Sequence, residues 1–277
     1  KGLQMLLDGR LETKLSSLTA RFTRPPTEGG WRDTYSAVAL RTDIENLVTE
    51  TVAITVVRRG IEERDRPSFG AGFFNDHQRP QDAESTSSHA LYLHGGWTRR
   101  RVDDLLAPSQ GWMAELEVGG GVPGASTRSF GRAVGKANGW VPLGADTTLV
   151  LRAEAGAVIA DSRVGIPSVF LFRTGGDTTV RGYAFESLGV TEGNAIVGGR
   201  YYAVASAEAI RWIGDSWGVA AFVDAGDAVD SASDLSLAVG VGVGMRVRTP
   251  IGPFRLDVAY GDRTDSVRLH FSVGLSF

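Results

Sequence analysis

The sequence predicts an all-β protein, specifically a transmembrane antiparallel β-barrel, and three observations support this prediction. Apolar and polar residues alternate with a period of two along most of the 277 residues, as expected for strands with one apolar and one polar face. The alternating segments recur at short intervals, separated by turn-like stretches. Their polar faces carry glycine and charges of both signs, which suits a wet lumen better than the dry core of a soluble sandwich.

About 14 segments show this alternation. They lie near residues 3–11, 16–24, 34–43, 50–59, 68–76, 89–100, 111–120, 128–140, 147–159, 199–211, 217–225, 235–248, 253–260 and 267–277. Tilted strands of ~9–11 residues are long enough to cross a bilayer. One long, Gly-rich connection, Asp161 to Gly198, separates two of the segments. It is too long for an ordinary hairpin loop, so we expect it to be functional.

The alternation is clearest near the C-terminus. From Leu235 to Arg248 every odd position is apolar and every even position is small or charged. The segments Phe254–Tyr260 and Val267–Phe277 repeat the pattern. Charges occupy the polar side of these three successive segments, at Arg246, Arg248, Arg255, Asp257 and Arg268. We therefore expect the apolar side to face lipid and the charged side to face a hollow, wet interior.

Composition excludes several classes of protein. The chain has no Cys and a formal net charge of −3. It therefore has neither a disulfide scaffold nor a Cys-based metal site, and its charge balance argues against a nucleic-acid partner. No apolar run approaches the ~18–20 residues of a membrane-spanning helix. The N-terminus lacks the pattern of a signal peptide, so we expect a mature chain or an internal fragment.

Other motifs favour structural interpretations. Gly240, Gly242 and Gly244 lie within a predicted strand, where they predict a smooth inner wall and not a dinucleotide-binding turn. The four His have no metal-binding spacing, and the acidic stretch Asp224–Asp234 lacks the pattern of a calcium loop. No Gly-x-Ser-x-Gly elbow is present. We expect no cofactor, no metal and no enzymatic activity, with a lumenal hydrolase triad as an open alternative.

A set of ordered motifs occupies about residues 168–277. Phe170–Tyr183 ends in Val180-Arg181-Gly182-Tyr183, and a strand bearing Glu208 follows. Phe222-Val223-Asp224-Ala225-Gly226 comes next, and the chain ends at Phe277 after another strand. This order resembles the outer-membrane assembly superfamily that includes BamA, TamA and the two-partner secretion pores. The runs Phe172–Asp177 and Arg211–Ser216 are most similar to the TamA branch, the barrel subunits of translocation and assembly modules.

This resemblance implies a barrel of about 16 strands whose sixth outer loop folds back into the lumen. By position, the loop tip is Val180, Arg181, Gly182 and Tyr183, and its partners on the inner wall are Asp224 and, as a further candidate, Glu208. Residues 1–277 then form the barrel domain, of the bacterial surface antigen type. The periplasmic POTRA domains and the first two strands are expected upstream, and a 14-stranded barrel is the alternative.

The resemblance also implies a function in the bacterial outer membrane. The expected activity is insertion or translocation of client β-barrel proteins, chiefly autotransporters, through a seam between the first and last strands. Gly274 is expected to bend the last strand, which Phe277 ends. The expected partners are outer-membrane lipid, the clients and a TamB-like protein anchored in the inner membrane. A two-partner-type polypeptide secretion pore and a BamA-like general barrel insertase are the alternatives.

Overall fold

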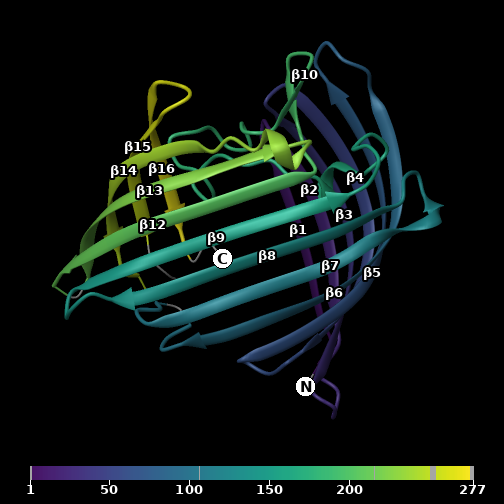
Figure 1. The fold of residues 1–277 in the computed structure, drawn as a ribbon. Helices are drawn as coiled ribbons and strands as arrows, with labels where there is room; N and C mark the ends of the chain where they lie inside the picture. The colour runs from purple at the N-terminus through teal and green to yellow at the C-terminus, as the bar shows by residue number, and fades with distance from the viewer. Residues whose placement is uncertain (1, 106, 215, 250–253, 275–277) are drawn as a thin grey trace.

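A single antiparallel sheet of 14 strands dominates the computed structural model, which describes residues 2–105, 107–214, 216–249 and 254–274. Every strand pairs with its neighbours in the chain, except that β9 pairs with β12 across a long connection (Figure 1). The strands of this sheet are β1 (Gln4–Leu11), β2 (Leu15–Thr23), β3 (Trp31–Ile44), β4 (Leu47–Gly60), β5 (Asp65–Pro80), β6 (Thr86–Val102), β7 (Gly111–Ser126), β8 (Phe130–Pro142), β9 (Thr147–Ile159), β12 (Tyr201–Ile213), β13 (Trp217–Val229), β14 (Ala238–Val247), β15 (Phe254–Gly261) and β16 (Ser266–Val273).

The predicted strands are all present, and their number and order are confirmed within the described residues. Strands β5, β6 and β7 are longer than predicted, with 16, 17 and 16 residues. The ends of these strands are polar, so the apolar alternation in the sequence stops there. The hydrogen-bonded ladder continues through these polar ends. Strand β14 begins at Ala238 and not at residue 235, because the preceding Ala232–Asp234 forms a single 3-10 turn, η2.

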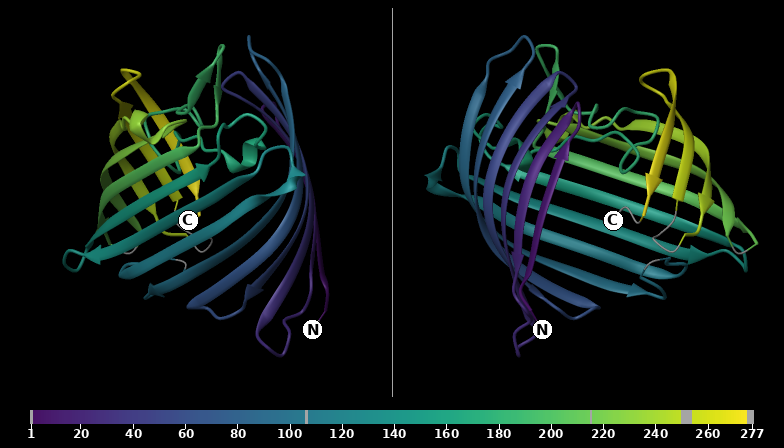
Figure 2. Two further views of the ribbon diagram at one scale, coloured as in Figure 1. Left: turned by 45° about the vertical axis from the view of Figure 1, so that its right-hand side comes forward. Right: turned by 180° about the vertical axis from the view of Figure 1, so that it is seen from behind.

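The sheet curls strongly about its own axis, so that its two ends face each other across the open side of the curl (Figure 2). No ladder joins β1 to β16 among the described residues, so the sheet is a curl and not a closed barrel. β16 ends at Val273, and Gly274 follows with a φ of 94°. The predicted end of the strand at Phe277 lies outside the described residues.

The two faces of the sheet have opposite character, as the alternation predicts. Apolar side chains of the C-terminal strands cover the convex face, where Val241, Phe271 and Val273 are 45%, 57% and 50% exposed. The concave face carries the small and charged residues of the same strands, and Asp224, Arg246 and Asp257 are buried there. Among the described residues, no helix is long and apolar enough to cross a membrane.

The connection between β9 and β12, residues 160–200, lies inside the curl against the concave face (Figure 2). It contains one 3-10 turn, η1 (Ser168–Phe170), and a small hairpin of β10 (Val190–Glu192) and β11 (Ala195–Val197). The sequence predicts a long functional loop in this place but not the hairpin. We call residues 160–200 the inner loop.

Candidate functional site

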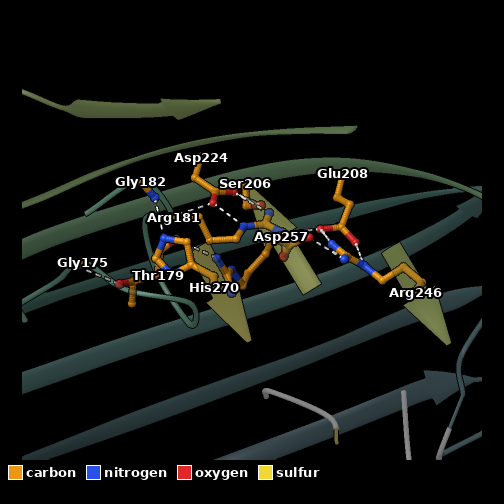
Figure 3. A network of polar contacts seen from close by, with 11 residues as sticks. Gly175, Thr179, Arg181, Gly182, Ser206, Glu208, Asp224, Arg246, Asp257 and His270 are labelled. Atoms are coloured by element: carbon orange, nitrogen blue, oxygen red, sulfur yellow. Dashed lines mark hydrogen bonds and ion pairs between the residues drawn. The ribbon is translucent and has the colours of Figure 1, made fainter. Parts of the chain in front are cut away.

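The centre of the site is Arg181, which the inner loop carries to the wall formed by β12, β13 and β15 (Figure 3). Its Nε and Nη2 donate to the two carboxylate oxygens of Asp224, at 2.7 and 2.9 Å. Its Nη1 donates to Glu208 at 2.6 Å and to Asp257 at 3.1 Å, and its backbone N–H also donates to Asp224, at 3.1 Å. A two-pronged bond of this kind fixes the orientation of the guanidinium as well as its position.

A second arginine completes the network from the wall itself. Arg246 of β14 donates from Nε and Nη2 to Glu208, at 2.9 and 2.8 Å, and from Nη1 to Asp257 at 2.5 Å. Glu208 and Asp257 therefore each bridge the two arginines. Ser206 donates its hydroxyl to Asp224 at 2.6 Å. Two guanidinium groups and three carboxylates thus form one buried network, in which every charged group has a partner.

The register of the sheet explains why these side chains meet. Ser206 of β12 lies opposite Asp224 of β13, and Gly244 of β14 lies opposite Asp257 of β15. Side chains two residues apart on a strand share a face, so Glu208 follows Ser206 and Arg246 follows Gly244 on the concave side. Four neighbouring strands thereby present their charges to one point.

Glycines make room for the loop tip at the wall. A Cβ added at Gly240 would lie 1.8 Å from the carbonyl oxygen of Arg181, and one at Gly244 would lie 1.7 Å from a carboxylate oxygen of Asp257. Val180 is fully buried against the same wall, and the Arg181 guanidinium carbon lies 3.3 Å from the centroid of the Phe222 ring. The smooth inner wall predicted from the Gly-x-Gly-x-Gly string is therefore present, and it receives the loop backbone.

The next residue of the loop tip connects to the last strands. Gly182 has a φ of 95°, and a Cβ there would lie 2.8 Å from backbone atoms of Tyr260 and Gly261. Glycine is the residue that tolerates both conditions. The Gly182 N–H donates to Nε2 of His270 on β16 at 2.9 Å, which requires Nε2 to be unprotonated.

Tyr183 fastens the loop tip to the turn between β15 and β16. Its hydroxyl donates to Asp262 and accepts the N–H of Arg263 at 2.9 Å. Burial and the Asp262 carboxylate raise the pKa of Tyr183 to about 12. The Tyr183 hydroxyl and the N–H of Val239 lower the pKa of Asp262. Each group thus holds the other in the protonation state that the hydrogen bond requires.

Burial alone would lower the pKa of Arg181, but the hydrogen bonds and charges of Asp224 and Glu208 outweigh it and raise that pKa. Arg181 is therefore a permanent cation. The chemistry of the network is that of an ion-paired anchor. No group of three or more His, Asp or Glu in the described ranges is arranged to hold a metal ion.

The inner loop is also attached to the opposite part of the wall. Ser168 donates from its N–H and its hydroxyl to Asp76 of β5, at 2.8 and 2.9 Å. Phe170 packs against Phe74 and Tyr92, with ring centroids 4.8 and 4.4 Å apart. Between the two attachments, Arg152 of β9 donates to the carbonyl of Thr179 at 2.7 Å.

The structure brings together five of the residues selected from the sequence, namely Val180, Arg181, Tyr183, Asp224 and Glu208, and Gly182 lies beside them. Gly274 follows β16 as a separate feature. Sequence reasoning placed Arg246 and Asp257 on the polar side of their strands but did not identify them as members of this network. Ser206 and His270 were also missed. The available signal was the alternation, which places Ser206 on the same face as Glu208 and places His270, like Asp257, on the polar face of its strand.

Comparison with known proteins identifies the family. Residues 10–277 match the Omp85 superfamily domain, so the chain belongs to the Omp85 superfamily. A structure of BamA from Haemophilus ducreyi lacking POTRA domains 1–3 matches with a TM-score of 0.82 and 18% identity, over 99% of this chain and 64% of that one.

Two CdiB structures are more distant. The one from Acinetobacter baumannii matches with a TM-score of 0.56 and 14% identity, over 94% of this chain and 50% of that one. The one from Escherichia coli has a TM-score of 0.59 and 13% identity, over 94% and 53%. At these identities the likeness shows the fold. The chain spans less than two thirds of the length of each of these proteins.

Proposed function

We propose that this chain is the barrel domain of an outer-membrane factor that inserts or translocates client β-barrel proteins. The observation that carries the proposal is the Arg181–Asp224 pair, which anchors an inner loop within a curled sheet whose convex face is apolar. An apolar exterior suits lipid, and a polar, loop-containing interior suits a lumen. Membership of the Omp85 superfamily supports the same role.

We propose further that the complete protein resembles TamA, with a barrel of about 16 strands and upstream POTRA domains. Its clients are then autotransporters, and a TamB-like inner-membrane-anchored protein is its partner. β16 would meet the first strand of that barrel at a seam. Unpaired backbone groups are costly in lipid, so a loosely bonded seam would gain free energy by pairing with a client strand. This is strand addition carried out within a membrane.

The alternative function is a polypeptide secretion pore of the two-partner type. The polar concave face favours it, because a chain crossing the membrane needs a wet path. In that case the inner loop would have to leave the lumen during transport. A general barrel insertase of the BamA kind differs from the first proposal only in its clients.

The test uses the full-length protein in liposomes. A cysteine pair that joins β16 to the first strand of the complete barrel should abolish client insertion when oxidised and restore it when reduced. Undiminished insertion under oxidising conditions would refute the seam. Conductance recordings separate the alternatives, because a secretion pore should open during transport with the seam still locked.

A further inference from the structure

A second feature of the concave face lies away from the Arg181 network. It is a cavity of about 510 Å³ on the inner wall of β4 to β8, below the η1 turn of the inner loop. None of the network residues lines it. Its lining combines aromatic rings, among them Phe74, Tyr92 and Phe170, with a group of cationic side chains.

Two of the cations are neutralised by neighbours. Arg132 lies 2.8 Å from the carboxylate of Glu117, and Lys136 lies 3.2 Å from that of Glu154. These pairs belong to the wall and have little charge left for a ligand.

The remaining three cations, Arg59, Arg66 and Arg100, form what we call the arginine triad. Among the residues that the structure describes, none of the three has a carboxylate partner within ion-pair distance. The Nε of Arg66 donates only to the carbonyl of Glu62, at 2.9 Å. The Nε of Arg100 is buried and has no hydrogen-bond partner. A buried donor without a partner costs free energy, so the wall itself does not satisfy this arginine.

The register places the triad on three adjacent strands. Arg59 of β4 is two residues beyond Val57, which pairs with Gly70, so it points to the same face as Ser68 and Arg66 of β5. Arg66 pairs with Thr98, two residues before Arg100 of β6. The charges of Arg59 and Arg100 both repel that of Arg66, and the charge of Glu63 attracts it. Adjacent strands are only ~4.7–4.9 Å apart, so the three arginines form a row of like charges, with Glu115 of β7 as the acidic residue of the same lining that has no ion-pair partner among the described residues.

The shape and lining of the cavity select among anions. A free phosphate ion would use the guanidinium groups and leave the aromatic part of the lining unused. An extended polypeptide places every second side chain on one face, at intervals of ~6.6–6.8 Å. It can therefore present carboxylates to the arginines and apolar groups to Phe74 and Val57, which are partly exposed in the lining.

We propose that this cavity binds an acidic, aromatic-containing segment of extended polypeptide through Arg59, Arg66 and Arg100. The inference rests on the proposed function in one respect, since a client or secreted chain inside the curl is the natural source of such a segment. Arginine suits the task because its guanidinium binds a carboxylate through two parallel hydrogen bonds. The free Glu115 in the lining disfavours segments with a dense negative charge.

The experiment measures peptide binding to the full chain in detergent by fluorescence polarisation at low salt. The probes are a labelled peptide of alternating Asp and Phe and a matched peptide of alternating Asn and Phe. The Asp peptide should bind at least about tenfold more tightly than the Asn peptide. The triple variant R59Q/R66Q/R100Q should lose this preference. The control R10Q/R41Q/R211Q removes the same charge from arginines outside the cavity and should keep it.

A charge-reversal variant tests the proposal more stringently than the Gln variant. The variant R59E/R66E/R100E should prefer a Lys–Phe peptide over the Asp–Phe peptide, while resistance of its inner loop to protease reports that the fold is intact. Equal binding of the Asp and Asn peptides, or unchanged preference in the triple Gln variant, would overturn the proposal. Displacement of the Asp peptide by inorganic phosphate at equal molar concentration would also overturn it, because that marks a site for free anions.

The proposal and the proposed function fail separately. Absence of client insertion by the wild-type protein, with its peptide preference intact, would count against the insertion role and leave the cavity assignment standing. Intact client insertion with no peptide preference would count against the cavity assignment and leave the insertion role standing.

Discussion

The carbonyl oxygen of Arg181 lies directly over Gly240, so closely that a Cβ at position 240 would come within 1.8 Å of it. The contact joins the backbone of the inner loop to the backbone of β14. A backbone atom cannot rotate away from a clash as the end of a flexible side chain can. The backbone of the loop tip therefore fits directly against the backbone of the wall.

Gly240→Ala should lift the loop tip from the wall. Overpacking of this kind costs about 1–3 kcal/mol, and it should also lengthen the Arg181–Asp224 bonds. The measurement is the rate of protease cleavage within residues 175–185, which should rise. Gly135→Ala on β8 is the matched control, because a Cβ there meets nothing within 4 Å. Equal protease resistance in the two variants would contradict this prediction.

Arg181→Ala should destabilise the protein, because it leaves the fully buried Asp224 without its cationic partner and removes one of the two arginines bound to Glu208. Removing one member of a buried ion pair costs roughly 3–5 kcal/mol. Arg181→Lys should recover only part of this, since an ammonium cannot bind Asp224 through two parallel bonds. Thermal unfolding in detergent and client insertion are the two measurements. Wild-type behaviour of both Arg181→Ala and Asp224→Ala would refute the anchoring role of the pair.

The Tyr183–Asp262 contact should set two pH limits on loop attachment. The lowered pKa of Asp262 means that its contribution is present above the usual carboxyl pKa and is lost as pH falls through the lowered value. The pKa of Tyr183, raised to about 12, means that its contribution is present below the ordinary phenol value and is lost as pH rises toward 12. Proteolysis of the loop against pH checks this, with Tyr183→Phe as the control that removes both limits. Identical profiles for the two proteins would contradict it.

Gly274→Ala should disfavour the backbone that follows β16. The φ of 94° is a conformation that costs an L residue about 1–2 kcal/mol, although space for the methyl group is open. If this bend loosens the proposed seam, the variant should insert clients more slowly while its thermal stability changes little. Gly139→Ala on β8, also with open space, is the control. An unchanged insertion rate in Gly274→Ala would separate the bend from the seam.

The strands could be predicted because alternation is a local property that survives in a single sequence. Both ends of β9 were predicted to the residue, at 147 and 159. The ends of β5 to β7 were not, because hydrogen bonding there continues where the apolar side chains stop. The β10–β11 hairpin was missed because its strands have three residues each, too few for a periodic pattern.

The candidate site divides in the same way. Arg181 and Asp224 belong to short motifs, so a resemblance could select them. Arg246 and Asp257 enter the network through register, which pairs Gly244 with Asp257 and is invisible in one strand at a time. Whether His270 contacts the loop depends on how close Gly182 lies to the wall, and only three-dimensional packing decides that distance. Alternation could place these side chains on the correct face but could not say which would touch.

The inner loop is held at Asp76 on β5 and again at Asp224 and His270 on β13 and β16. The inner loop thus cross-links two distant parts of one sheet. A curled sheet can change its girth by small shifts in strand angle, but a tie of fixed length resists such shifts. Any widening of the sheet must first break the contacts of the loop at one of these attachments. The attachment on the β5 side combines the two hydrogen bonds from Ser168 to Asp76 with the packing of Phe170 against aromatic rings of the wall. The attachment at Arg181 is a network of ion pairs, so widening must break either apolar packing or buried ion pairs.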